Sequence, residues 1–117
     1  SKLEKLCANA SPDKKVLITE CGGGARAGHR GAVDEYFTED NQYALYQKQV
    51  ETMGRIPYIK GISPWILYDF RCPRRTNTHQ EHYNRKGLLN EDKTLYKKAF
   101  YVMRDFYKKW QLPGSSL

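Results

Sequence analysis

The sequence predicts an α/β fold in which two buried parallel strands alternate with two amphipathic helices. Apolar runs place strands over 13–20 and 58–69, and apolar residues recur at helical spacing over 38–54 and 94–110. The order strand, loop, helix, strand, loop, helix is that of a βαβα unit. Two parallel strands cannot close a barrel, and their open edges require partners. The sequence therefore predicts a portion of a larger α/β fold, with all 117 residues in one domain.

The first predicted strand leads to a carboxylate. The run 16–18 is continuous, apolar and rich in β-branched residues, as in a strand buried on both faces. Glu20 stands at its C-terminal end, where α/β sheets and barrels gather catalytic groups. The Gly-rich segment 21–33 follows, and a loop of this length inside a compact domain is usually functional or disordered. Glu20 is therefore a candidate catalytic residue, with an ordinary loop carboxylate as the alternative.

Two helices flank this strand. Residues 2–9 have the pattern of a helix end, and Ser11-Pro12-Asp13 is typical of the turn that stops it. After the loop, Thr38 supplies a hydroxyl cap followed by two acids, and Gly54 ends the helix. One face of this helix carries Tyr43, Tyr46, Val50 and Met53. We interpret this face as core packing rather than a binding surface.

The second predicted strand, 58–69, carries large apolar side chains on both faces, which indicates an interior position. Trp65 lies within it, and a Trp on a buried strand packs in a core or lines a pocket. The polar segment 71–85 follows as a second long loop.

The last predicted helix, 94–110, is strongly amphipathic. Its apolar side comprises Ala99, Val102, Met103, Phe106 and Trp110, and its basic side Lys97, Lys98, Arg104, Lys108 and Lys109. Residues 111–117 contain Pro-Gly-Ser-Ser and predict a flexible tail.

The charge balance leaves several partner classes open. Lys and Arg number 20 against 13 Asp and Glu, which gives a net charge of +7. Such a balance suits nucleic acid, an anionic substrate or simple solubility. The basic residues are mostly scattered, although Arg71, Arg74, Arg75, Arg85 and Lys86 share one region. No nucleic-acid motif accompanies them. We therefore expect no nucleic-acid partner and keep a basic nucleic-acid-binding or non-catalytic interaction module as the alternative function.

The cysteines and the hydropathy indicate neither a disulfide-rich, a metal-binding nor a membrane protein. Cys7, Cys21 and Cys72 show no CxxC spacing, so neither a disulfide framework nor a zinc site is indicated. We expect no metal and no cofactor. No apolar run approaches the roughly 18–20 residues that span a bilayer, and residues 1–15 lack the apolar core of a signal peptide. We expect no membrane association and infer no compartment.

Five motifs in order carry a family resemblance. They are Leu17-Ile18-Thr19-Glu20-Cys21-Gly22, Ala27-Gly28-His29, Trp65-Ile66-Leu67-Tyr68-Asp69-Phe70-Arg71, Asn84-Arg85-Lys86-Gly87 and Lys97-Lys98-Ala99-Phe100. Together they resemble the C-terminal end of the catalytic (β/α)8 barrel of glycoside hydrolase family 2, which includes β-glucuronidases and β-galactosidases. The resemblance covers roughly residues 14–110.

The resemblance implies specific roles. Glu20 matches the nucleophile that ends the seventh barrel strand of a retaining enzyme. Trp65 matches a sugar-pocket residue on the eighth strand, and Asn84 with Lys86 matches the pair that holds the sugar carboxylate in glucuronidases. Cys21 departs from the family's usual aromatic residue at this position, and Gln80 from an Arg that is frequent in glucuronidases.

The resemblance also implies that the chain is incomplete as an enzyme. Retaining glycosidases need a second carboxyl group roughly 5–5.5 Å from the nucleophile. In this family that group is a Glu on the fourth strand, outside this chain. Within the chain, Glu35 and Glu39 are interpreted as first-turn or surface acids and Asp69 as a structural hydrogen-bonding group.

A full barrel takes about 250 residues, so the chain supplies about its last quarter. We expect a carbohydrate substrate for the parent enzyme, which the resemblance allows to be bacterial periplasmic or secreted. The isolated chain should lack useful glycosidase activity and should self-associate through its exposed strand edges.

Overall fold

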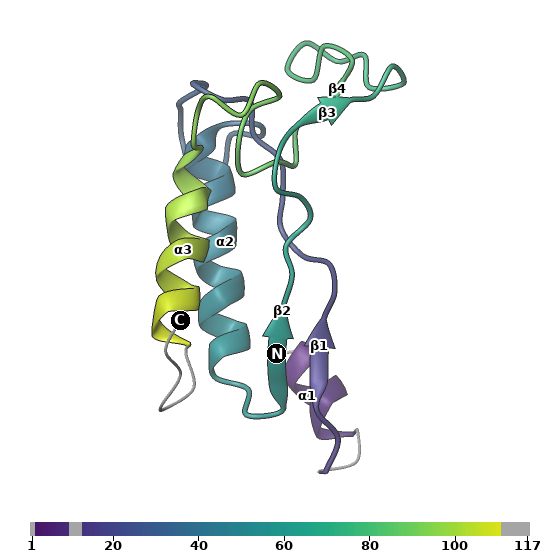
Figure 1. Ribbon diagram of the computed structural model, residues 1–117, viewed down its shortest axis with the longest axis vertical. Helices are drawn as coiled ribbons and strands as arrows, with labels where there is room; N and C mark the ends of the chain where they lie inside the picture. The colour runs from purple at the N-terminus through teal and green to yellow at the C-terminus, as the bar shows by residue number, and fades with distance from the viewer. Residues whose placement is uncertain (1, 10–12, 111–117) are drawn as a thin grey trace.

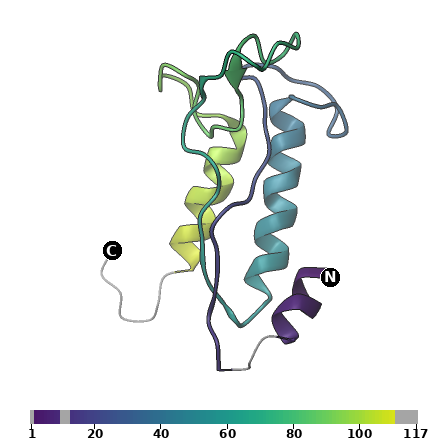
Figure 2. The same ribbon diagram turned by 90° about the vertical axis from the view of Figure 1, so that its right-hand side faces the viewer.

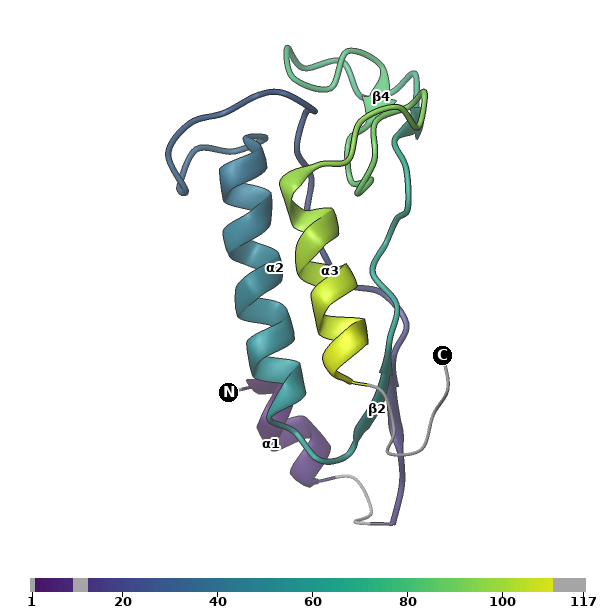
Figure 3. The same cartoon turned by 60° about the vertical axis from the view of Figure 1, so that its left-hand side comes forward.

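The computed structural model describes residues 2–9 and 13–110. It is a mixed α/β structure with the element order α1 (Lys2–Ala8), β1 (Val16–Ile18), α2 (Glu39–Gly54), β2 (Ile59–Ile62), β3 (Phe70–Arg71), β4 (Tyr83–Asn84) and α3 (Lys98–Lys109). The long helices α2 and α3 lie side by side, and the long loops that follow β1 and β2 gather at one end (Figures 1 and 3). The predicted tail at 111–117 lies outside the described residues.

Strands β1 and β2 form a short parallel sheet. Leu17 pairs with Gly61 and Ile18 with Ile62, after a shift in register next to Val16. In Figure 2 helices α2 and α3 lie behind the two strands. The core between these layers contains Tyr46, Met53, Ile56, Ile59, Ile62, Leu88, Leu89, Ala99 and Met103.

The prediction that the first strand is buried on both faces is wrong for the described chain. Leu17 is 65% exposed, because no described element covers the face of the sheet opposite the helices. Its side chain lies over Gly61, where a Cβ atom would come within 2.7 Å of it. The strand is also shorter than 13–20, since the regular ladder spans only Val16–Ile18.

The second strand is shorter than the predicted 58–69 as well. Regular pairing with β1 ends at Ile62, although the N–H groups of Ser63 and Trp65 still donate to the carbonyls of Ile18 and Cys21. From Ile66 onward the backbone has another partner, since the N–H of Ile66 donates to Lys86 and that of Asp69 to Leu89. Strands β3 and β4 then form a two-residue antiparallel ribbon.

Helix α2 begins where the capping pattern predicts. The Thr38 hydroxyl accepts a hydrogen bond from the N–H of Asn41 at 2.9 Å. The helix runs from Glu39 to Gly54, within one residue of the predicted 38–54. Of the predicted apolar face, Tyr46 and Met53 are buried, and Tyr43 and Val50 are half-buried.

Helix α3 begins four residues later than predicted, at Lys98 rather than at 94. The cause is Asn90, whose Oδ1 accepts hydrogen bonds from the N–H groups of Thr94 and Leu95 at 2.8 and 2.9 Å. This turn holds the chain out of the helix, and the N–H of Lys97 then donates to the carbonyl of Leu88. The residue before the helix is therefore extended.

Candidate functional site

Glu20 follows β1 and is exposed. No described residue donates a hydrogen bond to its carboxylate or pairs with it. The backbone beside it is fixed, because the carbonyl of Ile18 accepts from Ser63 at 2.8 Å and that of Cys21 from Trp65 at 2.9 Å. A carboxylate held by a strand and free of protein partners is available to a ligand.

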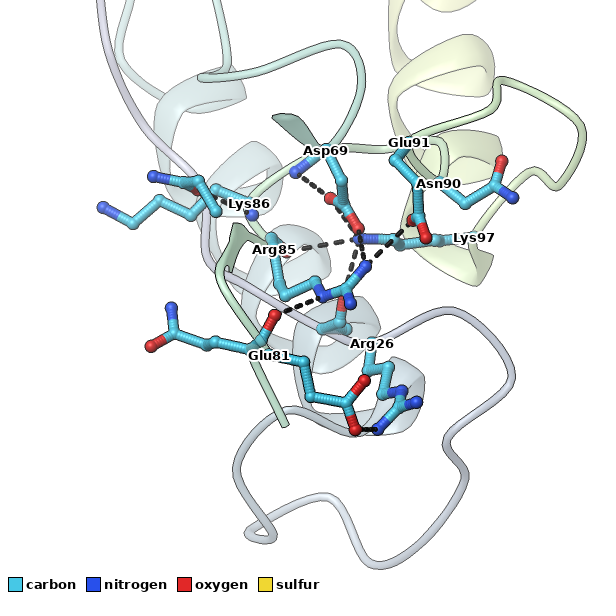
Figure 4. Close-up of polar contacts among 12 residues, drawn as sticks. Arg26, Asp69, Glu81, Arg85, Lys86, Asn90, Glu91 and Lys97 are labelled. Carbon is cyan, nitrogen blue, oxygen red and sulfur yellow. Dashed lines mark hydrogen bonds and ion pairs between the residues drawn. The ribbon is translucent and has the colours of Figure 1, made fainter. Parts of the chain in front are cut away.

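Trp65, Asn84 and Lys86 are brought together. The ammonium of Lys86 lies 5.6 Å from the centre of the Trp65 ring, within cation–π range. The N–H of Lys86 donates to Oδ1 of Asn84 at 3.0 Å, and its carbonyl accepts from Ile66 at 3.2 Å. The backbone of Lys86 is therefore fixed on both sides. In Figure 4 its side chain extends away from the neighbouring charged groups.

The segment of Glu20 is connected to these three residues by the backbone hydrogen bond from Trp65 to Cys21. Glu20 does not share a cavity with them in the part of the chain that the structure describes. Glu20 and Cys21 line a mostly apolar cavity of about 510 Å³, together with Leu3, Ile18, Leu45, Lys48, Gln49, Thr52 and Met53. Trp65, Asn84 and Lys86 do not line it. Within the described residues, Glu20 therefore does not share this cavity with the other three candidate residues.

A buried charged cluster lies behind the Lys86 turn (Figure 4). Lys97, fully buried, donates from Nζ to Oδ1 of Asp69 at 2.7 Å and to the carbonyls of Ala25 and Arg85 at 2.5 and 3.2 Å. All three ammonium hydrogens are thereby used. Oδ1 of Asp69 also accepts from the N–H of Gly87 at 2.9 Å. The cluster therefore connects four separate stretches of backbone.

The two charges of this pair perturb each other. Burial raises the pKa of Asp69 above its usual value, and the Lys97 ammonium partly offsets that rise. Burial lowers the pKa of Lys97, and the Asp69 carboxylate partly offsets that fall. Asp69 is thus a structural hydrogen-bonding group, as predicted from the sequence.

The sequence does not predict this role for Lys97, because helical spacing puts it on the basic side of the last predicted helix. Asp69 is the residue that indicates such a partner, because a carboxylate at the end of an interior strand requires a buried cation or hydrogen-bond donors.

Arg85 belongs to the same cluster and not to a basic surface. It is 5% exposed and donates to Glu91 at 2.9 Å and to the carbonyl of Gln80 at 3.2 Å. Its guanidinium also stacks on the Tyr83 ring, 4.7 Å from the centre. One of the clustered basic residues is therefore unavailable to a phosphate backbone.

The acids at the start of α2 also anchor the Gly-rich loop. Glu39 lies in the first turn of the helix and Glu35 is exposed, as predicted for these two residues. Glu39 accepts from the N–H of Gly28 at 2.7 Å and from that of Lys98 at 2.6 Å. Asp40 accepts from Arg30 at 2.7 and 2.8 Å and from the Lys98 ammonium at 2.9 Å. The Arg30 guanidinium holds the pKa of Asp40 well below its usual range. The loop after Glu20 is thereby fastened to both long helices.

The same loop contacts the second loop. Arg26 pairs with Glu81 at 2.8 Å, and the rings of His29 and His79 stack with centres 4.9 Å apart.

Across residues 2–9 and 13–110, no group of three or more His, Cys, Asp or Glu side chains is placed to hold a metal ion. None of the helices in the same residues is long and apolar enough to cross a membrane.

The sequence is similar to that of β-glucuronidases. It is 28% identical over 104 residues to a beta-glucuronidase of Bacteroides fragilis, and 27% identical over 99 residues to one of Streptococcus agalactiae. These matches cover 83% and 85% of this chain. The chain spans only 14% and 16% of the length of these relatives. No protein-family model matches it.

Solved structures give the same relationship. A glycoside hydrolase family 2 beta-galacturonidase of Eisenbergiella tayi bound to galacturonate matches 92% of this chain with a TM-score of 0.77 and 26% identity, over 20% of its own chain. A Bifidobacterium dentium beta-glucuronidase complexed with coumarin-3-O-glucuronide matches 83% with a TM-score of 0.62 and 29% identity, over 14% of its own chain. Over most of its length the chain thus resembles one part of these family 2 glycosidases.

Proposed function

We propose that this chain is the C-terminal part of the catalytic barrel of a retaining β-glycosidase that cleaves β-linked uronic acid sugars. The observation that carries this function is the link between Glu20, the Trp65 ring and the Asn84–Lys86 turn at the carboxyl ends of two parallel strands. The similar proteins support it, because their names specify glucuronides or galacturonides.

Glu20 acts as the nucleophile. Its carboxylate attacks the anomeric carbon while the bond to the leaving oxygen breaks, and a general acid protonates that oxygen. Water then cleaves the glycosyl ester and restores the carboxylate. The general acid comes from outside this chain, as the family resemblance implies. Within the chain, Asp69 is paired with Lys97 and Glu39 is held by two backbone N–H groups. The isolated chain is therefore inactive.

Lys86 binds the carboxylate of the sugar. A lysine ammonium acts as a compact point charge, and here its backbone is fixed while the side chain lies over Trp65. Asn84 is 2% exposed and its Oδ1 accepts from the N–H of Lys86, so its part in carboxylate binding is to fix the Lys86 turn. Trp65 forms the wall behind the sugar.

The remainder of the barrel covers the open side of the sheet. Besides Leu17, Leu67 is 57% exposed, and a largely apolar groove of about 480 Å³ lies between α3 and the segment 64–67. It is lined by Pro64, Leu67, Leu88, Phe100, Met103, Arg104 and Tyr107. In the barrel, β1 and β2 are the seventh and eighth strands, and this groove receives the neighbouring elements.

The test uses the intact protein that carries this chain. Glu20→Gln keeps the shape of the side chain and removes its charge, and we expect activity on an aryl β-D-glucuronide or β-D-galacturonide to fall by several orders of magnitude. Glu51→Gln, at an exposed position on α2, is the matched control and should retain activity. Activity that survives Glu20→Gln would refute the role of the nucleophile.

The substrate class is tested separately. Lys86→Ala should remove the preference for a uronide over the matched neutral β-D-galactoside, whereas Lys60→Ala, at an exposed position of β2, should keep it. A wild-type protein that prefers the neutral sugar would refute the uronide assignment and leave the glycosidase assignment intact.

A further inference from the structure

The loop after Glu20 and the turn that holds Lys86 are tied together directly behind the site. The N–H of Ala25 donates to the carbonyl of Arg85 at 2.9 Å. Two buried side chains add further bonds between the same stretches. One is Lys97, which reaches the carbonyls of both Ala25 and Arg85. The other is Gln42, in the first turn of α2.

Gln42 spans the two loops with a single amide group. Its Nε2 donates to the carbonyl of Gly23 at 2.9 Å and to that of Gly87 at 3.1 Å. A primary amide has two hydrogens, so both are used. Gly23 is three residues after Glu20, and Gly87 is next to Lys86. Because Gln42 is fully buried, water cannot replace these bonds.

The Lys86 turn has little freedom to shift as a unit once these bonds are made. The N–H of Gly87 is held by Asp69 at 2.9 Å, and a Cβ atom at Gly87 would overlap the backbone of Tyr68 and Asp69. The turn is therefore packed against the second strand segment on one side and bonded to Gln42 on the other. The amide of Gln42 fixes its position relative to the loop of Glu20.

We propose that Gln42 is a positioning residue for sugar discrimination. Through the carbonyls of Gly23 and Gly87 it sets where the Lys86 ammonium stands relative to Glu20, and so determines how strongly a uronic acid sugar is preferred over the matched neutral sugar. This role rests on the proposed function. Lys97 also bonds the carbonyls of Ala25 and Arg85, but its removal would take from Asp69 the ammonium that donates to it.

The test is Gln42→Met in the intact protein, because methionine keeps the unbranched length and removes both donors. kcat and KM are measured on an aryl β-D-uronide and on the neutral glycoside with the same aglycone. We expect kcat/KM for the uronide to fall about fivefold to tenfold, mainly through KM, which corresponds to about one net hydrogen bond. kcat on the neutral sugar should change less than about twofold. Gln47→Met, at an exposed position of the same helix, is the matched control.

A double-mutant cycle identifies the route of the effect. If Gln42 acts through Lys86, Gln42→Met should cause no further loss of discrimination in a Lys86→Ala background. Equal losses on both sugars, or an undiminished loss in the Lys86→Ala background, would show that Gln42 only stabilises the fold and would overturn the inference.

Two further measurements separate the remaining outcomes. If Gln42→Met does not fold, as judged by circular dichroism, Gln42→Asn retains the amide on a side chain one methylene shorter and should show a smaller loss of the same kind. If the wild-type protein shows no preference for the uronide, the proposed substrate class fails, and the role of Gln42 fails with it. The wild-type assay alone therefore distinguishes that failure from a failure of Gln42.

Discussion

Lys97→Met is the perturbation for which the structure predicts the largest loss of stability. The side chain is fully buried, and all three hydrogens of its ammonium are donated, to one carboxylate and two carbonyls. Methionine fills a similar volume but leaves Asp69 charged in the interior. The carboxylate would then retain the N–H of Gly87 and the Arg85 guanidinium, whose Nη1 is 3.5 Å away. Removing one partner of a buried ion pair costs about 3–5 kcal/mol.

Urea unfolding of the 117-residue chain, followed by tryptophan fluorescence, measures this loss as a change in the free energy of unfolding. A domain of this size is stable by about 5–15 kcal/mol, so the loss should move the unfolding midpoint to clearly lower urea. Lys60→Met makes the same substitution at an exposed position of β2, and we expect it to change stability by less than about 0.5 kcal/mol.

The reasoning would be refuted by a loss below about 1 kcal/mol for Lys97→Met. Such a result would mean that Asp69 is protonated or solvated when its partner is absent. The variant that replaces both residues, Lys97→Met with Asp69→Leu, distinguishes the charge from the packing. Because it removes the unpaired charge, it should recover part of the lost stability.

Three further predictions concern the backbone, the pH dependence and the open sheet. Gly87→Ala should destabilise the chain by about 1–3 kcal/mol in the same urea assay, because its Cβ would overlap the backbone of Asp69. A neutral effect would show that the turn can move. The pKa of Asp40 is lower in the folded chain than in the unfolded chain. Its contribution to stability is therefore complete above the pKa of the unfolded chain, about 4, and is lost as the pH falls toward the pKa of the folded chain. Asp40→Asn should therefore flatten the fall in unfolding free energy between pH 5 and 2, and an unchanged acid limb would contradict the pairing with Arg30. The apparent mass of the isolated chain in analytical ultracentrifugation should rise with concentration, and Leu17→Lys should reduce that rise, whereas a strict monomer would count against association through the open sheet.

The local sequence predicts the start of α2 correctly and the start of α3 incorrectly. The Thr38 cap was predictable because its hydroxyl bonds a backbone N–H only three residues away. The start of α3 was missed because the Asn90 side chain holds residues 94 and 95 in a turn, although the apolar periodicity continues through them. The spacing of apolar residues carries no information about a side-chain hydrogen bond that competes with the helix.

The candidate site divides in the same way. Glu20, Trp65, Asn84 and Lys86 could be named from the order of short motifs, because each motif is contiguous in the sequence. Their assignment as nucleophile and sugar-binding residues stays a prediction. The structure adds that the last three are in contact and that Glu20 is connected to them through the backbone.

By itself the sequence determined the α/β class, the order of the long elements and the amphipathic faces of the two long helices. These depend on side-chain periodicity and capping within a few residues, where the physical signal is local. Only the tertiary structure decided that Lys97 and Gln42 are buried connectors of the two site loops. Lys97 reaches a carbonyl 72 positions away and Gln42 one 45 positions away. Which polar side chain meets which buried carbonyl is set by how the helices pack against the loops, and no local pattern of residues encodes that packing.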